Sequence, residues 1–373
     1  MEAAERMGNE GFTRLLPGVL ALALIPCVRG GVPAAEPISP EPDSGATAAR
    51  VIRDPEEASV RTAIERGLRF LARMQLPSGA LGGKYPVAVT GLAGMAFLGA
   101  GHGYGERPYD DVLRKAVDFV LASQDREVPG YFSDTTSKMH GHCYAVLFLC
   151  EVYGELPEEE RRKVRAAIEG GVRVIEEAQN RKTSGWYYQP KDVEDDEASI
   201  TICALQALRA ANGIGLVVPK TIVDNGVSYV RKCQADDGSF WYRSLLSRGD
   251  NHTSFGLTVA AISVFHAAGI YESPEIRKGL EFVRRCLADY PDEPVKAAEK
   301  EFFLYANLYA AQAFYQAGGD IWASWYPLAR RYLLKHQSPG DGSWKDFYGD
   351  EFGTAMSLLI LEVPLNYLPI FQR

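Results

Sequence analysis

The sequence is poor in the features that mark several common classes of protein. No segment is rich in lysine and arginine, and the 40 basic residues are outnumbered by 48 acidic ones, which leaves a formal net charge of −8. Binding to nucleic acids or anionic membranes depends on a basic surface, so neither partner is expected. Cysteine is scarce as well, with 6 residues and no CxxC pair. A disulfide framework is therefore excluded, and neither a metal nor a cofactor is predicted.

Long hydrophobic runs are also missing, apart from one near the N-terminus. The segment LLPGVLALALIPCV follows Arg14 and is interrupted by Pro17 and Pro26, so it is too short and too broken for a membrane-spanning helix. A basic residue, an apolar run and the small residues of VPAA are instead typical of a signal peptide. We therefore predict a signal peptide over residues 1–35, a disordered Pro-rich linker over residues 36–54, and a periplasmic or secreted protein.

From about residue 55 the sequence shows helical periodicity. Strand-like alternation does not persist, whereas apolar residues recur at helical spacing, as in Leu113, Ala116, Val117 and Val120. A second kind of segment, such as ASITICALQALRAA, is apolar on nearly all sides, as expected of a fully buried helix. The two kinds alternate. Amphipathic helices are predicted to begin near residues 57, 107, 157, 219, 274 and 322, and apolar helices near residues 86, 136, 196, 252, 301 and 352.

The loops that end the amphipathic helices repeat as well. They begin with glutamine and continue with glycine or aromatic residues, at Gln75, Gln124, Gln179, Gln234 and Gln337, while Cys286 takes this place in the fifth unit. Intervals of about fifty residues indicate a repeat architecture, because one helical pair cannot bury its apolar helix alone. We therefore predict an all-α fold over residues 55–373, an (α/α)6 toroid in which parallel inner helices are ringed by outer ones.

The loop QSPGDGSW, with Gln337, Gly342 and Trp344, resembles the Gln-x3-Gly-x-Trp repeat of the prenyltransferase/squalene oxidase repeat family, and QADDGSFW is a second copy. The family includes squalene–hopene cyclases and the β subunits of protein prenyltransferases. The resemblance covers about residues 55–370 and is closest to exported bacterial single-toroid members. It implies a toroid with an isoprenoid or other hydrophobic ligand in its cavity. Whether the protein is an enzyme stays open; an activity would be of terpenoid cyclase or prenyltransferase type.

The repeat residues themselves are expected to be structural. A glutamine amide can hydrogen-bond a neighbouring helix end, and a tryptophan ring can lie over it. The segment HGHC, with His140, His142 and Cys143, is the one cluster of potential zinc ligands. Side chains two positions apart on a helix diverge by about 200°, so both imidazoles could face one zinc ion only if the helix began between them. A role in lining the cavity and ordinary packing remain the alternatives for these histidines.

Polar side chains at the starts of the inner helices are the candidates for a ligand site. These helices run in one direction, so their N-termini gather at one end, where their dipoles create a positive potential. We predict ligand-binding roles for His140, His142, Tyr144, Ser199, Asn251, His252, Glu301, Tyr305, Asn307 and Asp350.

The acidic stretch VEDDEASIT contains the candidate catalytic residues. Squalene–hopene cyclases protonate an alkene with the middle Asp of an Asp-x-Asp-Asp-Thr-Ala motif, so the resemblance implies Asp195 as the acid and Asp196 as its neighbour. The match departs at two positions, because Val193 stands at the first Asp and Glu197 at the Thr. Helix capping is the alternative interpretation, since acidic residues at a helix start complement its dipole.

Three hypotheses for the function remain open. The first is an isoprenoid-binding protein or isoprenoid enzyme, as the repeat resemblance implies. The second is a glycan-degrading enzyme, because many α/α toroids cleave glycans with two carboxylates in the groove. The third is a non-catalytic scaffold that presents its loops to a protein partner, and it predicts a cavity filled by side chains.

Overall fold

The computed structural model describes residues 55–244, 251–298 and 302–372, all of which belong to one compact unit, Ile52–Arg373. The predicted signal peptide and linker lie outside the described residues, as does the candidate ligand residue Glu301. Within the described part, no helix combines the length and the apolar composition needed to cross a membrane.

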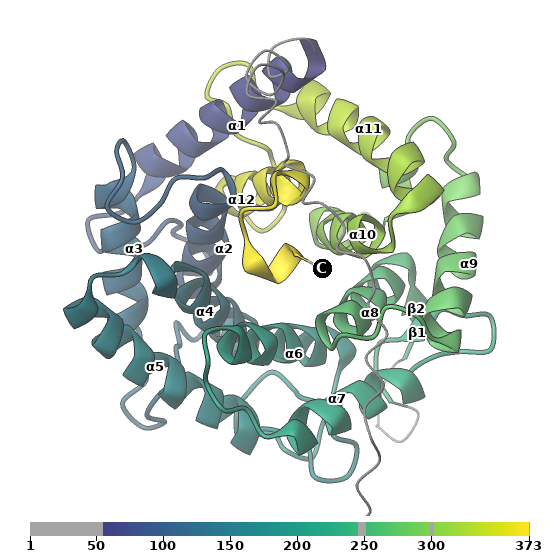
Figure 1. Ribbon diagram of the computed structural model, residues 1–373, viewed down its shortest axis with the longest axis horizontal. Helices are drawn as coiled ribbons and strands as arrows, with labels where there is room; N and C mark the ends of the chain where they lie inside the picture. Colours follow the sequence, from purple (N-terminus) through teal and green to yellow (C-terminus); the bar gives the residue numbers. More distant parts are fainter. Residues whose placement is uncertain (1–54, 245–250, 299–301, 373) are drawn as a thin grey trace, which may run out of the picture. The chain divides into compact units, whose positions relative to one another are not determined.

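The described residues form twelve α-helices in two concentric rings (Figure 1). The outer ring consists of α1 (Pro55–Met74), α3 (Asp110–Ala122), α5 (Glu158–Glu177), α7 (Lys220–Lys232), α9 (Pro274–Ala288) and α11 (Gly319–His336). The inner ring consists of α2 (Pro86–Gly99), α4 (Lys138–Val152), α6 (Ala198–Gly213), α8 (Phe255–Ala267), α10 (Phe303–Ala317) and α12 (Asp350–Glu362). The predicted alternation of helices and the all-α toroid are confirmed.

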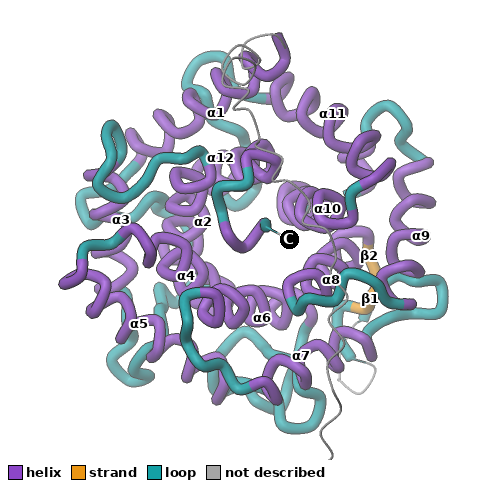
Figure 2. The backbone as a smooth tube through the Cα atoms, viewed as in Figure 1, coloured by secondary structure: helices purple, strands orange, loops and turns teal. Residues whose placement is uncertain are grey.

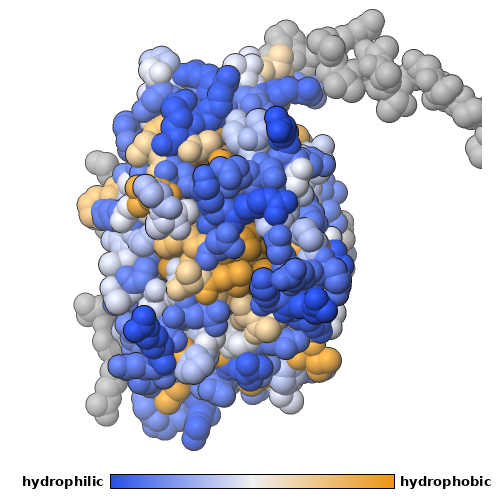
Figure 3. All heavy atoms as spheres, turned by 90° about the vertical axis from the view of Figure 1, so that its left-hand side faces the viewer, coloured by the Kyte–Doolittle hydropathy of each residue, from blue (hydrophilic) through white to orange (hydrophobic). Residues whose placement is uncertain are grey.

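The helices of the two rings differ in how much of their surface is buried. Each inner helix packs against its two inner neighbours and against an outer helix, so α8 is buried from Phe255 to His266. An outer helix buries only one stripe, such as Gly226, Val227, Tyr229 and Val230 in α7. Its other side chains face solvent, and the side of the molecule near α3 and α5 is accordingly mostly hydrophilic (Figure 3).

The ring closes between its last and first units. Helix α12 packs against both α1 and α2, so segments from the two ends of the described chain lie side by side (Figure 2). The side-chain amide of Gln337 donates to the carbonyl of Ala63, at 2.9 Å, and to that of Gly342, at 2.8 Å. The same amide therefore fixes its own loop and joins it to α1.

The repeat residues hold neighbouring units together, as predicted. Four glutamines each donate to a carbonyl of their own loop and to one on the next outer helix: Gln75, Gln179, Gln234 and Gln337. Gln124 differs, because its amide donates to Leu121 of its own helix. The indole N–H groups of Trp186 and Trp344 donate to the carbonyls of Ile175 and Leu333 at equivalent places.

A second repeated contact joins each inner helix to the loop before it. In four units a threonine hydroxyl accepts a hydrogen bond from a backbone N–H of that loop: Thr90, Thr201, Thr258 and Thr354. His142 accepts in the same way from Phe132 through Nδ1, at 3.1 Å. Asn307 instead donates to the carbonyl of Val295, at 3.2 Å. These six side chains satisfy buried backbone groups that water cannot reach.

Short elements complete the unit. Strands β1 (Phe240–Trp241) and β2 (Thr253–Ser254) pair antiparallel before α8, with Phe240 opposite Ser254. The 3-10 helices are η1 (Tyr153–Glu155), η2 (Pro294–Ala297), η3 (Val363–Leu365) and η4 (Pro369–Phe371).

The C-terminal tail with η4 crosses the ring at the C-terminal ends of the inner helices (Figure 1). The carbonyls of Phe371 and Gln372 accept hydrogen bonds there from Gln316 of α10 and Arg209 of α6. The tail therefore covers the end of the ring opposite the N-termini of the inner helices.

Gly238 lies where the loop of one helical pair contacts the outer helix of the next, and its replacement is predicted to destabilise the fold. Its φ is +93°, and a Cβ there would lie 2.3 Å from the carbonyl oxygen of Lys278 on α9. Gly238→Ala should therefore lower the free energy of unfolding by about 2–4 kcal/mol in urea denaturation. Gly269→Ala is the matched control, because Gly269 has φ +77° but open space around its Cβ position. Gly269→Ala should lower the free energy of unfolding by only about 1 kcal/mol. Equal losses would show that the close approach to Lys278 is unimportant.

Candidate functional site

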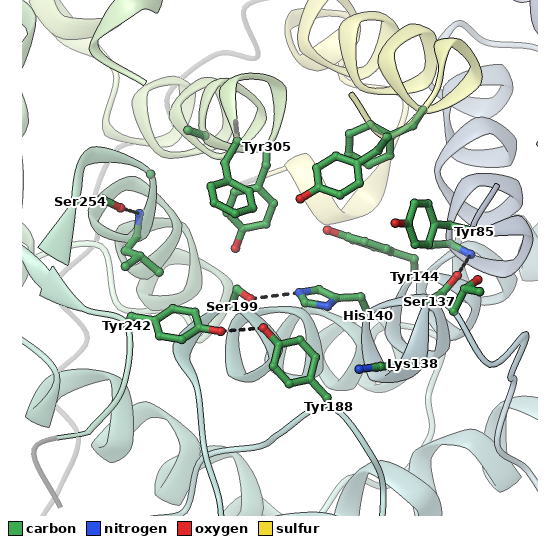
Figure 4. Close-up of a pocket in the computed structure, with 18 of the residues that line it drawn as sticks. Tyr85, Ser137, Lys138, His140, Tyr144, Tyr188, Ser199, Tyr242, Ser254 and Tyr305 are labelled. Carbon is green, nitrogen blue, oxygen red and sulfur yellow. Dashed lines mark hydrogen bonds between the residues drawn. The ribbon is translucent and has the colours of Figure 1, made fainter. Parts of the chain in front are cut away.

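A cavity of about 610 Å³ opens among the N-terminal ends of the inner helices (Figure 4). All six inner helices or their preceding loops contribute to its wall. The lining residues are Tyr85, Ala88, Thr136, Ser137, Lys138, His140, Tyr144, Tyr188, Ser199, Tyr242, His252, Ser254, Gly256, Leu257, Phe302, Tyr305, Ala306, Tyr348 and Phe352. None of these described lining residues is an aspartate or a glutamate.

Polar groups gather on one side of this cavity. Lys138, His140, Ser199, Tyr188 and Tyr242 come from α4, α6 and the two loops beside them, and Tyr305 lies across the cavity from them (Figure 4). The hydroxyl groups of Tyr188 and Tyr242 are 2.6 Å apart, and Lys138 Nζ stands 5.1 Å from the centre of the Tyr188 ring. The cavity therefore has a polar wall and an aromatic wall.

The phenols of the polar wall stay neutral at ordinary pH. Burial, followed by the negative charge of Glu197, raises the pKa of Tyr242 to about 12. The same two causes raise the pKa of Tyr188 as well. Both hydroxyl groups can therefore donate a hydrogen bond to each other or to a ligand oxygen.

Two lining residues have a backbone conformation that L-residues rarely adopt. Tyr85, the residue before α2, has φ +58°, and Lys138, the first residue of α4, has φ +54°. The left-handed region costs about 1–2 kcal/mol for a residue with a Cβ. Such strain is concentrated at functional sites, where it fixes the direction of a side chain.

Glu197 lies behind the polar wall and caps α6. Its carboxylate accepts hydrogen bonds from the backbone N–H of Ser199, at 2.7 Å, and of Ile200, at 3.1 Å. It also accepts from the Ser199 hydroxyl, whose oxygen is 3.0 Å from His140 Nε2. Burial raises the pKa of Glu197 to about 7 despite these bonds, which favour the charged form.

The structure places the two candidate catalytic aspartates outside the cavity lining. Asp195 is exposed, and its backbone carbonyl accepts from Asn180. Asp196 is buried and accepts from the hydroxyl of Tyr229, at 2.7 Å, and from the backbone N–H of Ser244, at 3.1 Å. Neither residue supplies the side-chain cap of α6, which is Glu197. A catalytic role for Asp195 or Asp196 stays a prediction.

The predicted ligand residues fall into two groups. His140, Tyr144, Ser199, His252 and Tyr305 line the cavity together. The other described candidates are engaged elsewhere. His142 and Asn307 are buried in the contacts that join helices to loops, Asn251 pairs with the backbone of Arg243, and Asp350 is bonded to Lys345.

The two histidines of HGHC point in different directions, as their spacing predicts. His140 faces the cavity. His142 is fully buried, accepts at Nδ1 from Phe132 and donates from Nε2 to the carbonyl of Gly171, at 3.1 Å. Burial lowers the pKa of each to about 4, so both are neutral at pH 7. Within the described residues, no three Cys, His, Asp or Glu side chains are grouped to hold a metal ion.

Sequence reasoning assigns no site role to Glu197 or Tyr242, and it includes Tyr188 only among the many aromatic residues that could face the cavity. In the cyclase motif Glu197 stands only as a departure at the Thr position, although a polar residue directly before an apolar helix is also typical of a helix cap. Tyr188 and Tyr242 each lie two residues after the buried loop aromatic, Trp186 or Phe240. Alignment of the repeat loops on that aromatic would have placed both tyrosines beside the inner helices.

A layer of buried polar groups forms the floor below Tyr144 and Tyr305. The Tyr309 hydroxyl donates to Gln206, at 3.2 Å, and Gln206 donates to Gln312, at 2.8 Å. Cys203 Sγ is 3.6 Å from the Tyr309 hydroxyl. These groups fill the middle of the ring and separate the cavity from the C-terminal tail.

Solved structures with the same helical arrangement come from proteins of different activities. An inactive variant of the α-1,6-mannanase GH76A of Salegentibacter sp. HEL1_6, in complex with α-1,6-mannotriose, has a TM-score of 0.61 at 8% identity, and the match covers 81% of this chain and 98% of the mannanase. A variant of the type II terpene cyclase MstE from Scytonema, in complex with geranylgeranyl dihydroxybenzoate, has a TM-score of 0.54 at 13% identity, covering 83% and 99%. A cellobiose 2-epimerase from Bacillus thermoamylovorans B4167 has a TM-score of 0.59 at 10% identity, covering 82% and 100%.

No protein-family model matches the chain, and no curated protein matches its sequence. The structural similarities show that this chain has the α/α-toroid fold of terpene cyclases, mannanases and epimerases. They show the fold alone, because one fold supports unrelated reactions. Membership of the prenyltransferase/squalene oxidase repeat family stays a prediction from the repeat motif.

Substitution of the two aspartates should separate their roles. Asp196→Ala leaves the buried Tyr229 hydroxyl and the Ser244 N–H without their acceptor, so it should lower the free energy of unfolding by about 2–4 kcal/mol. Asp195→Ala removes an exposed carboxylate and should change it by less than about 0.5 kcal/mol. Urea denaturation of both variants measures this difference. A stable Asp196→Ala protein would contradict the structural role.

Proposed function

We propose that the central cavity binds a hydrophobic ligand of the isoprenoid class. The observation that carries the proposal is the composition of the cavity wall. Aromatic rings from Tyr85, Phe302, Tyr305, Tyr348 and Phe352 contribute to a space of about 610 Å³, and no carboxylate is among the described lining residues. Ligand pockets of this volume are typically lined by hydrophobic and aromatic side chains with a few polar groups that fix orientation.

Two further observations support an isoprenoid. The repeat loops resemble those of the prenyltransferase/squalene oxidase repeat family, whose ligands are isoprenoids. The terpene cyclase with the same fold was solved with geranylgeranyl dihydroxybenzoate, which is described as its substrate. Aromatic faces also attract the positive charge that develops in isoprenoid reactions.

The composition of the cavity lining does not favour protonation of an alkene by Asp195. That reaction needs a strong carboxylic acid inside the apolar pocket. Asp195 is exposed and does not contribute to the described lining. The proposal therefore covers binding of the isoprenoid and leaves the cyclase-like and prenyltransferase-like activities as hypotheses.

The alternatives have less support. A glycan hydrolase needs two carboxylates flanking the scissile bond, and the described part of the lining contains neither an aspartate nor a glutamate. A protein scaffold predicts a filled cavity, whereas this one is open. We also propose that the chain is exported, on the strength of its N-terminal sequence, and N-terminal sequencing of the mature protein would reveal the expected cleavage.

Ligand binding can be tested with purified protein. Organic-solvent extraction followed by mass spectrometry should release an isoprenoid lipid in stoichiometric amount. Added geranylgeraniol should raise the melting temperature, because a ligand at 100 times its dissociation constant stabilises the native state by about 2.7 kcal/mol.

Mannotriose is the matched control for the glycan hypothesis. It should leave the melting temperature unchanged. An empty extract together with stabilisation by mannotriose alone would refute the isoprenoid proposal and favour a glycan ligand.

A further inference from the structure

His140 and Ser199 connect the cavity to a carboxyl group behind its wall. His140 Nε2 lies 3.0 Å from Ser199 Oγ, as the dashed line in Figure 4 shows. Ser199 Oγ is hydrogen-bonded in turn to Glu197 Oε1. Glu197 is fully buried, whereas His140 and Ser199 line the cavity. The three side chains form one continuous hydrogen-bonded chain from the protein interior to the ligand space.

We propose that Glu197, Ser199 and His140 form a proton relay, in which His140 Nδ1 is the general base for a hydroxyl group of the bound ligand. His140 is the catalytic residue, and Ser199 and Glu197 are positioning residues that act through it. That this ligand also has an apolar isoprenoid part rests on the proposed function.

The geometry allows two protonation states of the relay. A serine hydroxyl has a single proton to donate. When Glu197 is ionised, Ser199 donates to Glu197, and His140 must donate from Nε2 to Ser199. When Glu197 is protonated, it donates to Ser199, Ser199 donates to His140 Nε2, and the imidazole proton resides on Nδ1. Within the described residues Nδ1 has no hydrogen-bond partner, which leaves it available to a ligand.

The relay avoids forming an imidazolium ion in an apolar site. Burial, followed by the charge of Lys138, lowers the pKa of His140 to about 4, so this imidazole alone would be a weak base at pH 7. The proton accepted at Nδ1 is matched by one leaving Nε2 for Ser199, while the Ser199 proton moves to Glu197. The final acceptor has a pKa raised to about 7, which suits proton transfer near neutral pH.

The charged neighbours of the relay are cations, and no carboxylate is among the described groups that act on its two ends. Among the described residues, Arg243 is a cationic group that acts on Glu197, and Lys138 is one that acts on His140. The other titratable groups that sense the charge of Glu197 are neutral phenols and a thiol: Tyr188, Tyr229, Tyr242, Tyr305 and Cys203. Asp196, next to Glu197 in the chain, faces Tyr229 and Ser244 instead.

The polar wall indicates which hydroxyl group would be the substrate. An anion formed beside His140 would lie near Lys138, whose charge acts on this imidazole, and near the hydroxyl pair of Tyr188 and Tyr242. A phenolic or enolic hydroxyl suits a base of this strength, because its proton is far more acidic than that of an alcohol. In the step, the O–H bond breaks, Nδ1–H forms, and the negative charge moves from Glu197 to the ligand oxygen.

Nitrogen NMR of the full-length, 15N-labelled protein tests the relay without any ligand. As the pH falls from 8.5 to 5.5, His140 should change from the Nε2–H to the Nδ1–H tautomer, with a midpoint at about pH 7, where Glu197 takes up its proton. No imidazolium should form in this range. His142 is the internal control, because its Nδ1 accepts from Phe132 and its tautomer is fixed at Nε2–H. A single His140 tautomer over the whole range would overturn the relay.

Two substitutions should abolish the transition and one should preserve it. Glu197→Gln removes the titrating group, and Ser199→Ala breaks the link, so neither variant should show a tautomer change near pH 7. Ser254→Ala is the matched control, because Ser254 lines the same cavity and caps α8 without contacting His140. A transition that persists in Glu197→Gln would overturn the proposal, even if Ser199→Ala failed to fold.

The ligand assignment has its own test. At pH 8.5, 4-geranylphenol should change the nitrogen signals of His140, whereas its methyl ether, which lacks the hydroxyl proton, should bind without changing them. Equal effects of the two probes would overturn the role of His140 as a base for this hydroxyl. If neither probe binds while the ligand-free transition is present, the isoprenoid proposal fails and the relay stands.

Discussion

Each described loop that leads into the inner ring has a buried residue where it meets the inner helix, and the backbone group there must find a partner inside the protein: Leu81, Phe132, Trp186, Phe240, Val295 and Trp344. The inner helices provide these partners through one polar side chain near each N-terminus, a threonine in four units, His142 in the second and Asn307 in the fifth. Because these bonds hold the loops against the helices, Tyr188, Tyr242 and the other loop residues have fixed positions around the cavity. The shape of the cavity therefore depends on hydrogen bonds made by side chains outside its lining.

The sequence predicts the fold well because the fold repeats. Alternation of amphipathic and apolar helices, with glutamine at nearly constant spacing, determines both the helices and the ring. The site is less predictable, because it is made by departures from the repeat. His140 and His142 look alike in the sequence, yet only a helix start at Lys138 decides which one faces the cavity.

The acidic stretch before α6 shows the same limit at the level of single residues. Asp195, Asp196 and Glu197 are consecutive carboxylates, but one is exposed, one binds Tyr229 and Ser244, and one caps the helix. Charge and spacing cannot distinguish these environments. Burial decides them, and burial depends on where the loops of neighbouring units lie.

The floor of Gln206, Tyr309 and Gln312, together with the tail across the far end, leaves the cavity as a blind well. Any bound molecule would enter and leave by the same opening, at the end of the ring where the inner helices begin. A long molecule that enters with one end first would leave by the reverse path. Exchange of bound for free molecules would therefore be sequential, because a second molecule could enter only after the first had left.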